Sequence, residues 1–274
     1  MAPRIKPPAL AVLAALASLS VGCGHRAPDE KARSIVTSDT ILSGMCASLL
    51  PAGSFTVDSI MPPGQCPGHY DMKLSDLVKA KEAVLVVSFV GMPFMRQAET
   101  DANRQLLVDA QDRNWMAPHS YAAGLNMLAD RLAERFPEYA PQIRAGLERA
   151  VGEVAVTDRD LSDTLARAGI GRKPVIASSM LREPLEWMGL RVVGEYGRPE
   201  SISAKQIASL IRIGSEERAV MVVDNLQSGP EAGKGIAEAL GVPHVIFSNF
   251  PSEKGYAATL GDNVRAALAA LGAK

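Results

Sequence analysis

Residues 137–168, PEYAPQIRAGLERAVGEVAVTDRDLSDTLARA, divide the chain into two halves that follow the same pattern. Apolar residues recur in this stretch at helical spacing, at Ile143, Leu147, Val151, Val154, Leu161, Leu165 and Ala168. The spacing predicts a mostly helical segment, with Gly152 and Thr157 as candidate bends. We expect residues 137–169 to form a helical linker that limits hinge opening between the two halves.

Short runs rich in Val and Ile alternate with helical patterns on both sides of this linker. The predicted strands are 34–38, 55–60, 84–89 and 105–109 before it, and 174–177, 191–194, 219–223 and 244–247 after it. Helices are predicted at 41–50, 74–81, 121–135, 203–214, 230–240 and 254–271. Such alternation is typical of parallel sheets. We therefore predict an α/β fold with two lobes, residues 34–136 and 170–274, each a small, mostly parallel sheet flanked by helices.

The composition excludes several classes of protein. Of the 274 residues, 47% are hydrophobic and 22% are charged, which excludes a disordered tail, a coiled coil and a collagen-like repeat. Aromatic residues make up only 5%, and the formal net charge is −1. Neither a stacking surface nor a basic surface is indicated, so we expect no nucleic-acid partner.

The N-terminus has the pattern of a secretory signal. Arg4 and Lys6 precede an apolar run over residues 9–22, which is too short for a comfortable membrane span. The run ends Leu19-Ser20-Val21-Gly22-Cys23 and resembles the lipobox of bacterial lipoproteins, although Ser20 replaces the usual aliphatic residue. The resemblance implies that residues 1–22 are removed, that Cys23 is lipidated, and that residues 23–33 tether a periplasmic or otherwise extracytoplasmic protein to the membrane. The alternative is a plain cleaved signal peptide, with Cys23 incidental.

Two further cysteines, Cys46 and Cys66, remain in what would be an oxidising compartment. We expect a disulfide between them, which would close a loop of about 20 residues and stabilise the fold by about 3 kcal/mol. The alternatives are two separate thiols, or Cys66 as a metal ligand.

Two of the four histidines follow predicted strands. His69 comes after strand 55–60 and His119 after strand 105–109. Ligands of open parallel sheets bind beyond the carboxyl ends of the strands, and imidazole suits zinc, copper, nickel and iron. We therefore expect both histidines to contact a metal, although two ligands cannot complete a site.

The other predicted strand ends are rich in hydrogen-bonding groups. Asp224-Asn225-Leu226-Gln227-Ser228 follows strand 219–223, where Asp224 would supply charge and Asn225 or Gln227 would orient a ligand. The alternative is an Asx turn that leads into the next helix. Glu183 and Glu186 lie in a predicted helix, and at least one of them is expected on a solvated face. His244 opens a strand and is expected to be structural.

Several segments together carry a family resemblance. They are Ile35-Val36-Thr37, Ile60-Met61-Pro62-Pro63-Gly64 leading to His69, Ser75-Asp76-Leu77, Pro118-His119-Ser120-Tyr121, Phe136-Pro137-Glu138-Tyr139, Gly189-Leu190-Arg191-Val192 and the helix 256–271. Over most of residues 34–272 the chain resembles the zinc- and manganese-binding solute-binding proteins of bacterial ABC importers. The resemblance implies the same two-lobed fold, with a metal between the lobes held by three histidines and a carboxylate, or by two of each.

By position, His69 and His119 match the first two ligands of that family. Ser178 stands at the third position and Asn249 at the fourth, so two strong ligands are missing. The resemblance implies that Asp224 corresponds to a glutamate that some members have after the third strand of the C-terminal lobe. Three arrangements stay open. In the first, His69, His119 and Asp224 hold the metal together with water. In the second, a free Cys66 is a fourth ligand. In the third, a metal chelate or small organic ligand binds through Ser178, Asn225, Gln227 and Asn249.

The resemblance implies a lipid-anchored solute-binding protein that captures a transition-metal ion, most simply zinc or manganese, or a complex of one. We expect a monomer that delivers this ligand to an ABC permease and its ATPase. The alternatives are a metal-storage or adhesin-type lipoprotein, or a binder of a small organic solute without direct metal ligation. We expect no enzymatic activity, since the chain has no Gly-x-Ser-x-Gly or His-Glu-x-x-His motif, and it has no phosphate-binding loop of its own.

Overall fold

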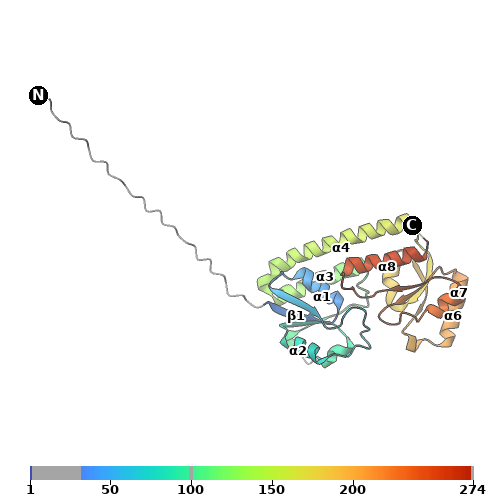
Figure 1. The fold of residues 1–274 in the computed structure, drawn as a ribbon, viewed down its shortest axis with the longest axis horizontal. Helices are drawn as coiled ribbons and strands as arrows, with labels where there is room; N and C mark the ends of the chain where they lie inside the picture. The colour runs from blue at the N-terminus through green and yellow to red at the C-terminus, as the bar shows by residue number, and fades with distance from the viewer. Residues whose placement is uncertain (2–31, 99–100, 273–274) are drawn as a thin grey trace. The chain divides into compact units, whose positions relative to one another are not determined.

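The computed structural model describes residue 1, residues 32–98 and residues 101–272 (Figure 1). The predicted signal peptide, Cys23 and nearly all of the tether lie outside the described residues. None of the helices in the described part of the chain is long and apolar enough to span a membrane.

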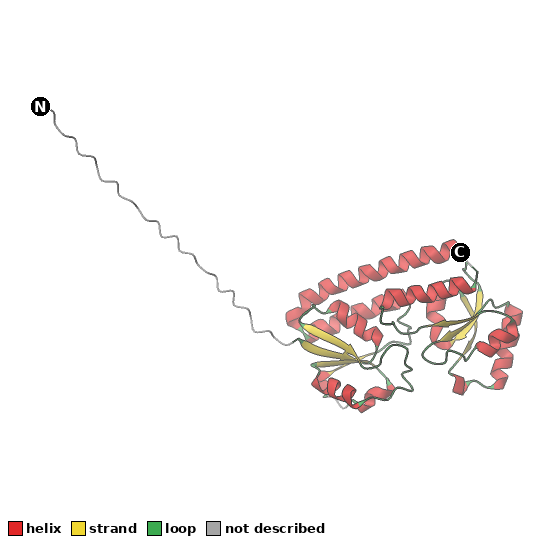
Figure 2. Ribbon diagram, viewed as in Figure 1, coloured by secondary structure: helices red, strands yellow, loops and turns green. Residues whose placement is uncertain are grey.

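The N-terminal lobe contains a four-stranded parallel sheet with the order β2-β1-β3-β4. Its strands are β1 (Arg33–Thr37), β2 (Phe55–Ser59), β3 (Leu85–Phe89) and β4 (Gln105–Val108). Its helices are α1 (Thr40–Leu49), α2 (Leu74–Glu82) and α3 (Pro118–Arg135), with 3-10 turns at Pro93–Gln97 and Ala102–Arg104. Helices α1 and α3 cover one face of the sheet and α2 covers the other (Figures 1 and 2).

The C-terminal lobe repeats this plan, with the strand order β6-β5-β7-β8 and parallel pairing throughout. Its strands are β5 (Pro174–Ser178), β6 (Arg191–Tyr196), β7 (Val222–Asn225) and β8 (His244–Phe247). Its helices are α5 (Arg182–Trp187), α6 (Ala204–Glu217), α7 (Lys234–Leu240) and α8 (Tyr256–Ala270), with 3-10 turns at Ser179–Leu181 and Pro199–Ser201. The sequence-based prediction of two α/β lobes is therefore confirmed.

The linker is one continuous helix, α4 (Ala140–Ala168), which follows a 3-10 turn at Pro137–Tyr139 and ends at Gly169 in the left-handed conformation (φ 62°). Its predicted bends at Gly152 and Thr157 do not interrupt it. It packs first against the N-terminal lobe through Ile143, Ala150 and Val154, and then against the C-terminal lobe through Leu165. Helix α8 lies beside it (Figure 1), so two helices run along the same side of both lobes.

The predicted disulfide does not form, because Cys46 and Cys66 are both free thiols. Helix α1 returns antiparallel to the strands, which carries Cys46 about 9 Å back from the edge where the helix begins. There Cys46 is fully buried in the core, and burial raises the pKa of its thiol. Cys66 lies half-buried in the loop after β2, at the carboxyl edge of the sheet. The even cysteine count was therefore misleading.

Candidate metal site

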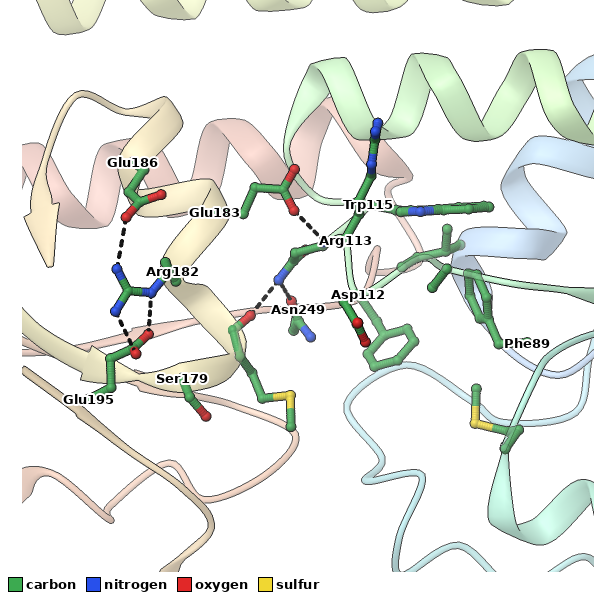
Figure 3. A pocket seen from close by; sticks show the side chains of 16 residues that line it. Phe89, Asp112, Arg113, Trp115, Ser179, Arg182, Glu183, Glu186, Glu195 and Asn249 are labelled. Carbon is green, nitrogen blue, oxygen red and sulfur yellow. Dashed lines mark hydrogen bonds and ion pairs between the residues drawn. The ribbon is translucent and has the colours of Figure 1, made fainter.

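A pocket of about 600 Å³ lies between the two lobes, at the carboxyl ends of both sheets (Figure 3). The loops after β3 and β4 supply one wall, and those after β5 and β8, with the end of β6, supply the other. The lining residues are Ile41, Phe89, Met92, Ala110, Asp112, Arg113, Asn114 and Trp115 from the N-terminal lobe, and Ser179, Met180, Arg182, Glu183, Glu186, Glu195, Asn249 and Phe250 from the C-terminal lobe. This is the edge at which parallel sheets bind ligands.

Glu183 joins the lobes at one side of this pocket. It lies in the first turn of α5, and its Oε1 is 2.8 Å from Nε2 of His119 in the first turn of α3. Ser120 Oγ also donates to Oε1, and the backbone N–H of Asn114 donates to Oε2. Because the N-terminus of a helix carries unpaired N–H groups and a partial positive charge, α3 attracts this carboxylate.

His119 and Glu183 are suitable ligands for one divalent ion. Zinc binds imidazole nitrogen and carboxylate oxygen at about 2.0–2.2 Å, which separates two tetrahedral ligands by about 3.3 Å. The observed separation of 2.8 Å is close to that value, so an ion could replace the contact with a small movement. Among residues 32–98 and 101–272, however, no three His, Cys, Asp or Glu side chains are grouped so that they could hold a metal.

Asn249 lies in the pocket, at the position where the family resemblance implies an aspartate. Its side-chain oxygen accepts from the amide of Asn114, which also donates to the carbonyl of Met180. The Asn114 oxygen accepts in turn from the N–H of Met116, at 2.8 Å. Asn114 thus ties the two lobes together beside Glu183.

Asn225 and Gln227 are buried and hold the loop that carries Asn249. Gln227 Oε1 accepts from the N–H of Asn249 at 2.8 Å, and its amide donates to Ser248 Oγ at 2.9 Å. Asn225 Oδ1 accepts from the N–H of Gln227 at 2.9 Å. Neither residue lines the pocket, so both position the loop. Ser178 ends β5 and is buried, and its neighbour Ser179 lines the pocket instead.

Asp224, one of the predicted ligands, does not line the pocket. Its side chain is fully buried away from the pocket and accepts hydrogen bonds from Tyr196 Oη at 2.7 Å and from the N–H of Gly233 at 2.9 Å. His244 Nε2 lies 2.6 Å from Oδ2 of the same carboxylate. Burial, followed by the Asp224 charge, raises the pKa of Tyr196. The carboxylate therefore ties β7 to its neighbours, and His244 is structural, as the sequence predicted.

His69 lies on an exposed loop outside the pocket lining. Its N–H donates to the carbonyl of Cys66 at 3.0 Å, which closes a turn. At Gly68 this loop meets the other lobe, because the glycine lies against the guanidinium group of Arg198 and leaves no room for a side chain. Within the described part of the chain, His69 thus does not join His119 and Glu183 in a group of three metal-ligating side chains.

The pocket also contains Arg182 and Glu195, for which no role was predicted from the sequence. Arg182 donates to Glu195 from two nitrogens, at 2.8 and 2.6 Å, and to Glu186 at 3.0 Å (Figure 3). These pairings, with that to Glu195 the largest, raise the pKa of Arg182. A usable sequence signal existed, because Glu195 directly follows the predicted strand 191–194 and Arg182 follows the predicted strand 174–177 by a few residues.

Two α/β lobes with the same strand order, a joining helix and a pocket between them define a bilobal solute-binding protein. The chain belongs to the ZnuA family, described as the periplasmic component A of the zinc-uptake complex, whose model matches residues 35–273. No curated protein sequence matches the chain significantly.

Solved structures share this fold at low sequence identity. A crystal structure of ZnuA matches with a TM-score of 0.72 and 17% identity, over 87% of this chain and 99% of that one. The laminin-binding protein Lmb of Streptococcus agalactiae, described as a bifunctional protein with adhesin and metal-transporting activity, matches at 0.71 and 15%, with the same coverage. A manganese-bound periplasmic metal-binding protein from Candidatus Liberibacter asiaticus matches at 0.73 and 12%, again over 87% and 99%.

Proposed function

We propose that this protein captures a divalent transition-metal ion, zinc or manganese, outside the cytoplasmic membrane and delivers it to an ABC permease and its ATPase. Membership of a periplasmic zinc-uptake family supports this role, which is solute binding rather than catalysis. The observation that carries the proposal at the level of residues is the contact between His119 and Glu183, which joins an imidazole and a carboxylate across the two lobes.

The proposed ligand set differs from the one expected from sequence. His119 and Glu183 hold the metal, and Asn249, which lines the pocket and accepts from the Asn114 amide, supplies a weaker oxygen ligand. His69 is proposed as a further ligand that reaches the metal only when its loop moves. Asp224 is not included, because its carboxylate is fully used within the C-terminal lobe.

We also propose the processing and division of the chain that its sequence indicates. Residues 1–22 form a signal peptide and residues 23–33 a tether anchored through lipid on Cys23, followed by lobes 34–136 and 170–274 and linker 137–169. Replacing Cys23 with Ser is expected to release the monomeric protein from membranes and to remove the mass of the lipid. Membrane retention at unchanged mass would contradict the anchor.

The metal content of the protein isolated from its native membrane without chelators tests the function. We expect about one equivalent of zinc or manganese by elemental analysis, and loss of that metal in a Glu183→Gln variant. A Glu216→Gln variant is the matched control, because Glu216 pairs with Arg212 on the exposed face of α6. Wild-type protein without any transition metal, which also takes none up on incubation, would contradict the proposal.

An adhesin is a second candidate function, favoured by the fold shared with Lmb. An adhesin would bind an extracellular-matrix protein whether or not metal is present. Attachment of the purified protein to immobilised laminin, measured with and without chelator, tests this candidate, and absence of attachment in both conditions would dismiss it.

A further inference from the structure

The pocket is much larger than a bare metal ion requires. An ion held entirely by side chains fills about the space of a water molecule, roughly 30 Å³. The pocket between the lobes has a volume of about 600 Å³, within the range of about 300–1,000 Å³ that is typical of sites for small organic molecules. The pocket therefore has room for a ligand with an organic part as well as the ion.

The walls offer contacts that an ion cannot use. Phe89 and Trp115 pack edge to face, with ring centroids 4.8 Å apart, and lie on one side of the pocket (Figure 3). Phe250, Met92 and Met180 add further apolar surface. The opposite side is polar and carries Arg182 with Glu195. Such a combination of an apolar wall and a few polar groups is typical of organic ligand sites.

The protein also supplies too few strong ligands for a complete metal site. A bound zinc ion needs about four ligands, whereas at this boundary the contact between His119 and Glu183 is not joined by a third His, Cys, Asp or Glu of the described residues. Asn249 is a weak ligand, and His69 would reach the metal only after its loop moves. A small chelator that arrives with the metal would supply the remaining donors and would fill the pocket at the same time.

The charge of the pocket limits which chelator can enter. Asp112, Glu183, Glu186 and Glu195 line it together with only Arg113 and Arg182, so its formal charge is −2 before any contribution from His119. A divalent ion with one amino-acid chelator is a monocation, which this pocket attracts. A complex with a tricarboxylate is an anion, which it repels.

We propose that this pocket captures a divalent metal already chelated by a small amino-acid-type ligand with nitrogen donors, and that His119 and Glu183 complete the coordination of the metal. The inference rests on the metal-binding function proposed above and specifies the form in which the metal arrives. The aromatic wall then packs on the organic part of the chelate.

Calorimetry of the full-length protein with zinc alone, zinc with one equivalent of L-histidine, and zinc with one equivalent of citrate tests the proposal. Capture of the chelate predicts that histidine lowers the apparent Kd for zinc at least tenfold and that citrate does not. If the protein takes only the bare ion, histidine competes for zinc and raises the apparent Kd, which would overturn the proposal while the metal-binding function stands. Binding of zinc in none of the three arms would overturn both.

A Ser179→Trp variant tests whether the tightening of zinc binding by histidine arises in this pocket. The added indole would fill the pocket, so we expect it to remove the tightening by histidine. Ser215→Trp, on the exposed face of α6, is the matched control and should behave as wild type. An undiminished histidine effect in a folded Ser179→Trp variant, checked by its thermal midpoint, would show that the chelate does not bind in this pocket.

Discussion

At the scale of single residues, Asp224 shows how burial decides the role of a carboxylate. Its oxygens accept hydrogen bonds from Tyr196 and Gly233, and His244 lies against it at 2.6 Å. A buried carboxylate that loses a partner retains its cost of desolvation, which is about 1–3 kcal/mol or more for a charged group. The strength of this network therefore depends on each of its members.

Replacing His244 with Ala is expected to lower the free energy of unfolding by about 2–3 kcal/mol, because one side of the buried Asp224 carboxylate would be left without a partner. Urea denaturation of metal-free protein measures the change. His69→Ala is the control, since that side chain is exposed, and should change stability by less than about 0.5 kcal/mol. An equal, small effect of both substitutions would contradict the structural role of His244.

Asp39 makes stability depend on pH. This fully buried residue caps α1 by accepting from the N–H groups of Ile41 and Leu42, and burial raises its pKa from 3.8 to about 6, in spite of the opposing hydrogen bonds. The folded state therefore binds a proton more tightly than the unfolded state. Its contribution is fully present below about pH 4 and is lost as the pH rises through 6, by about 3 kcal/mol in total.

Asp39→Asn should remove this dependence, because Asn keeps the cap and has no charge to desolvate. We expect the variant to gain stability relative to wild type as the pH rises from 4 to 7, in urea denaturation at matched pH values. A difference between the two proteins that stays constant across this range would contradict the assignment.

At the scale of elements, two glycines in α4 have opposite roles. A Cβ at Gly146 would lie 2.6 Å from the carbonyl oxygen of Leu49 and 2.9 Å from that of Ser48, both of them backbone atoms that cannot move aside. A Cβ at Gly152 would meet nothing within 4 Å. Gly146 thus allows α4 to approach the end of α1 closely, whereas Gly152 only lowers helix propensity.

Substitution of each glycine by Ala should therefore change stability in opposite directions. Gly152→Ala should stabilise by up to about 1 kcal/mol through helix propensity. Gly146→Ala gains the same propensity but forces α4 away from α1, and we expect a net loss of about 1–2 kcal/mol. Thermal unfolding of the pair measures both changes, and stabilisation by both would refute the close approach.

The strands were predictable from sequence and the interactions between elements were not. All eight predicted strands form, because runs of Val and Ile such as those in β3 and β5 are buried on both faces of their sheets. The helix predicted to begin at Pro230 begins instead at Lys234, as α7. The N–H of Gly233 donates to Asp224, which holds the preceding turn outside the helix. Helix α5 has only six residues, too few for a periodic signal.

The same distinction applies to the candidate site. The strand-end positions of His119 and Asn249 suggested that both belong to the candidate site. In the structure His119 contacts Glu183 beside the pocket, and Asn249 lines the pocket. Glu183 could not be predicted as a site residue. The sequence around a carboxylate on a short helix is the same whether the side chain faces solvent or contacts α3 of the other lobe. The buried position of Asp224 could not be predicted, because nothing local indicates its contacts with Tyr196 and His244.

At the scale of the whole described fold, the lobes are joined by more than the linker helix. The ring of Tyr256, at the start of α8, stacks on Tyr121 of α3 with centroids 3.8 Å apart, and its hydroxyl donates to the carbonyl of Met116 at 3.1 Å. Thr40 Oγ1 donates to the carbonyl of Pro251 at 2.8 Å. These contacts lie next to residues that line the pocket, because Ile41 follows Thr40, Trp115 precedes Met116 and Phe250 precedes Pro251.

Titration calorimetry of zinc and manganese into wild type, His119→Ala, Glu183→Gln and the control Glu216→Gln tests the central claim most directly. The account predicts one binding site in wild type and in the control, a loss of affinity of at least about 100-fold in His119→Ala and a loss of about 10-fold or more in Glu183→Gln. Wild-type affinity in a folded His119→Ala variant would contradict the assignment of the metal to the contact between the lobes.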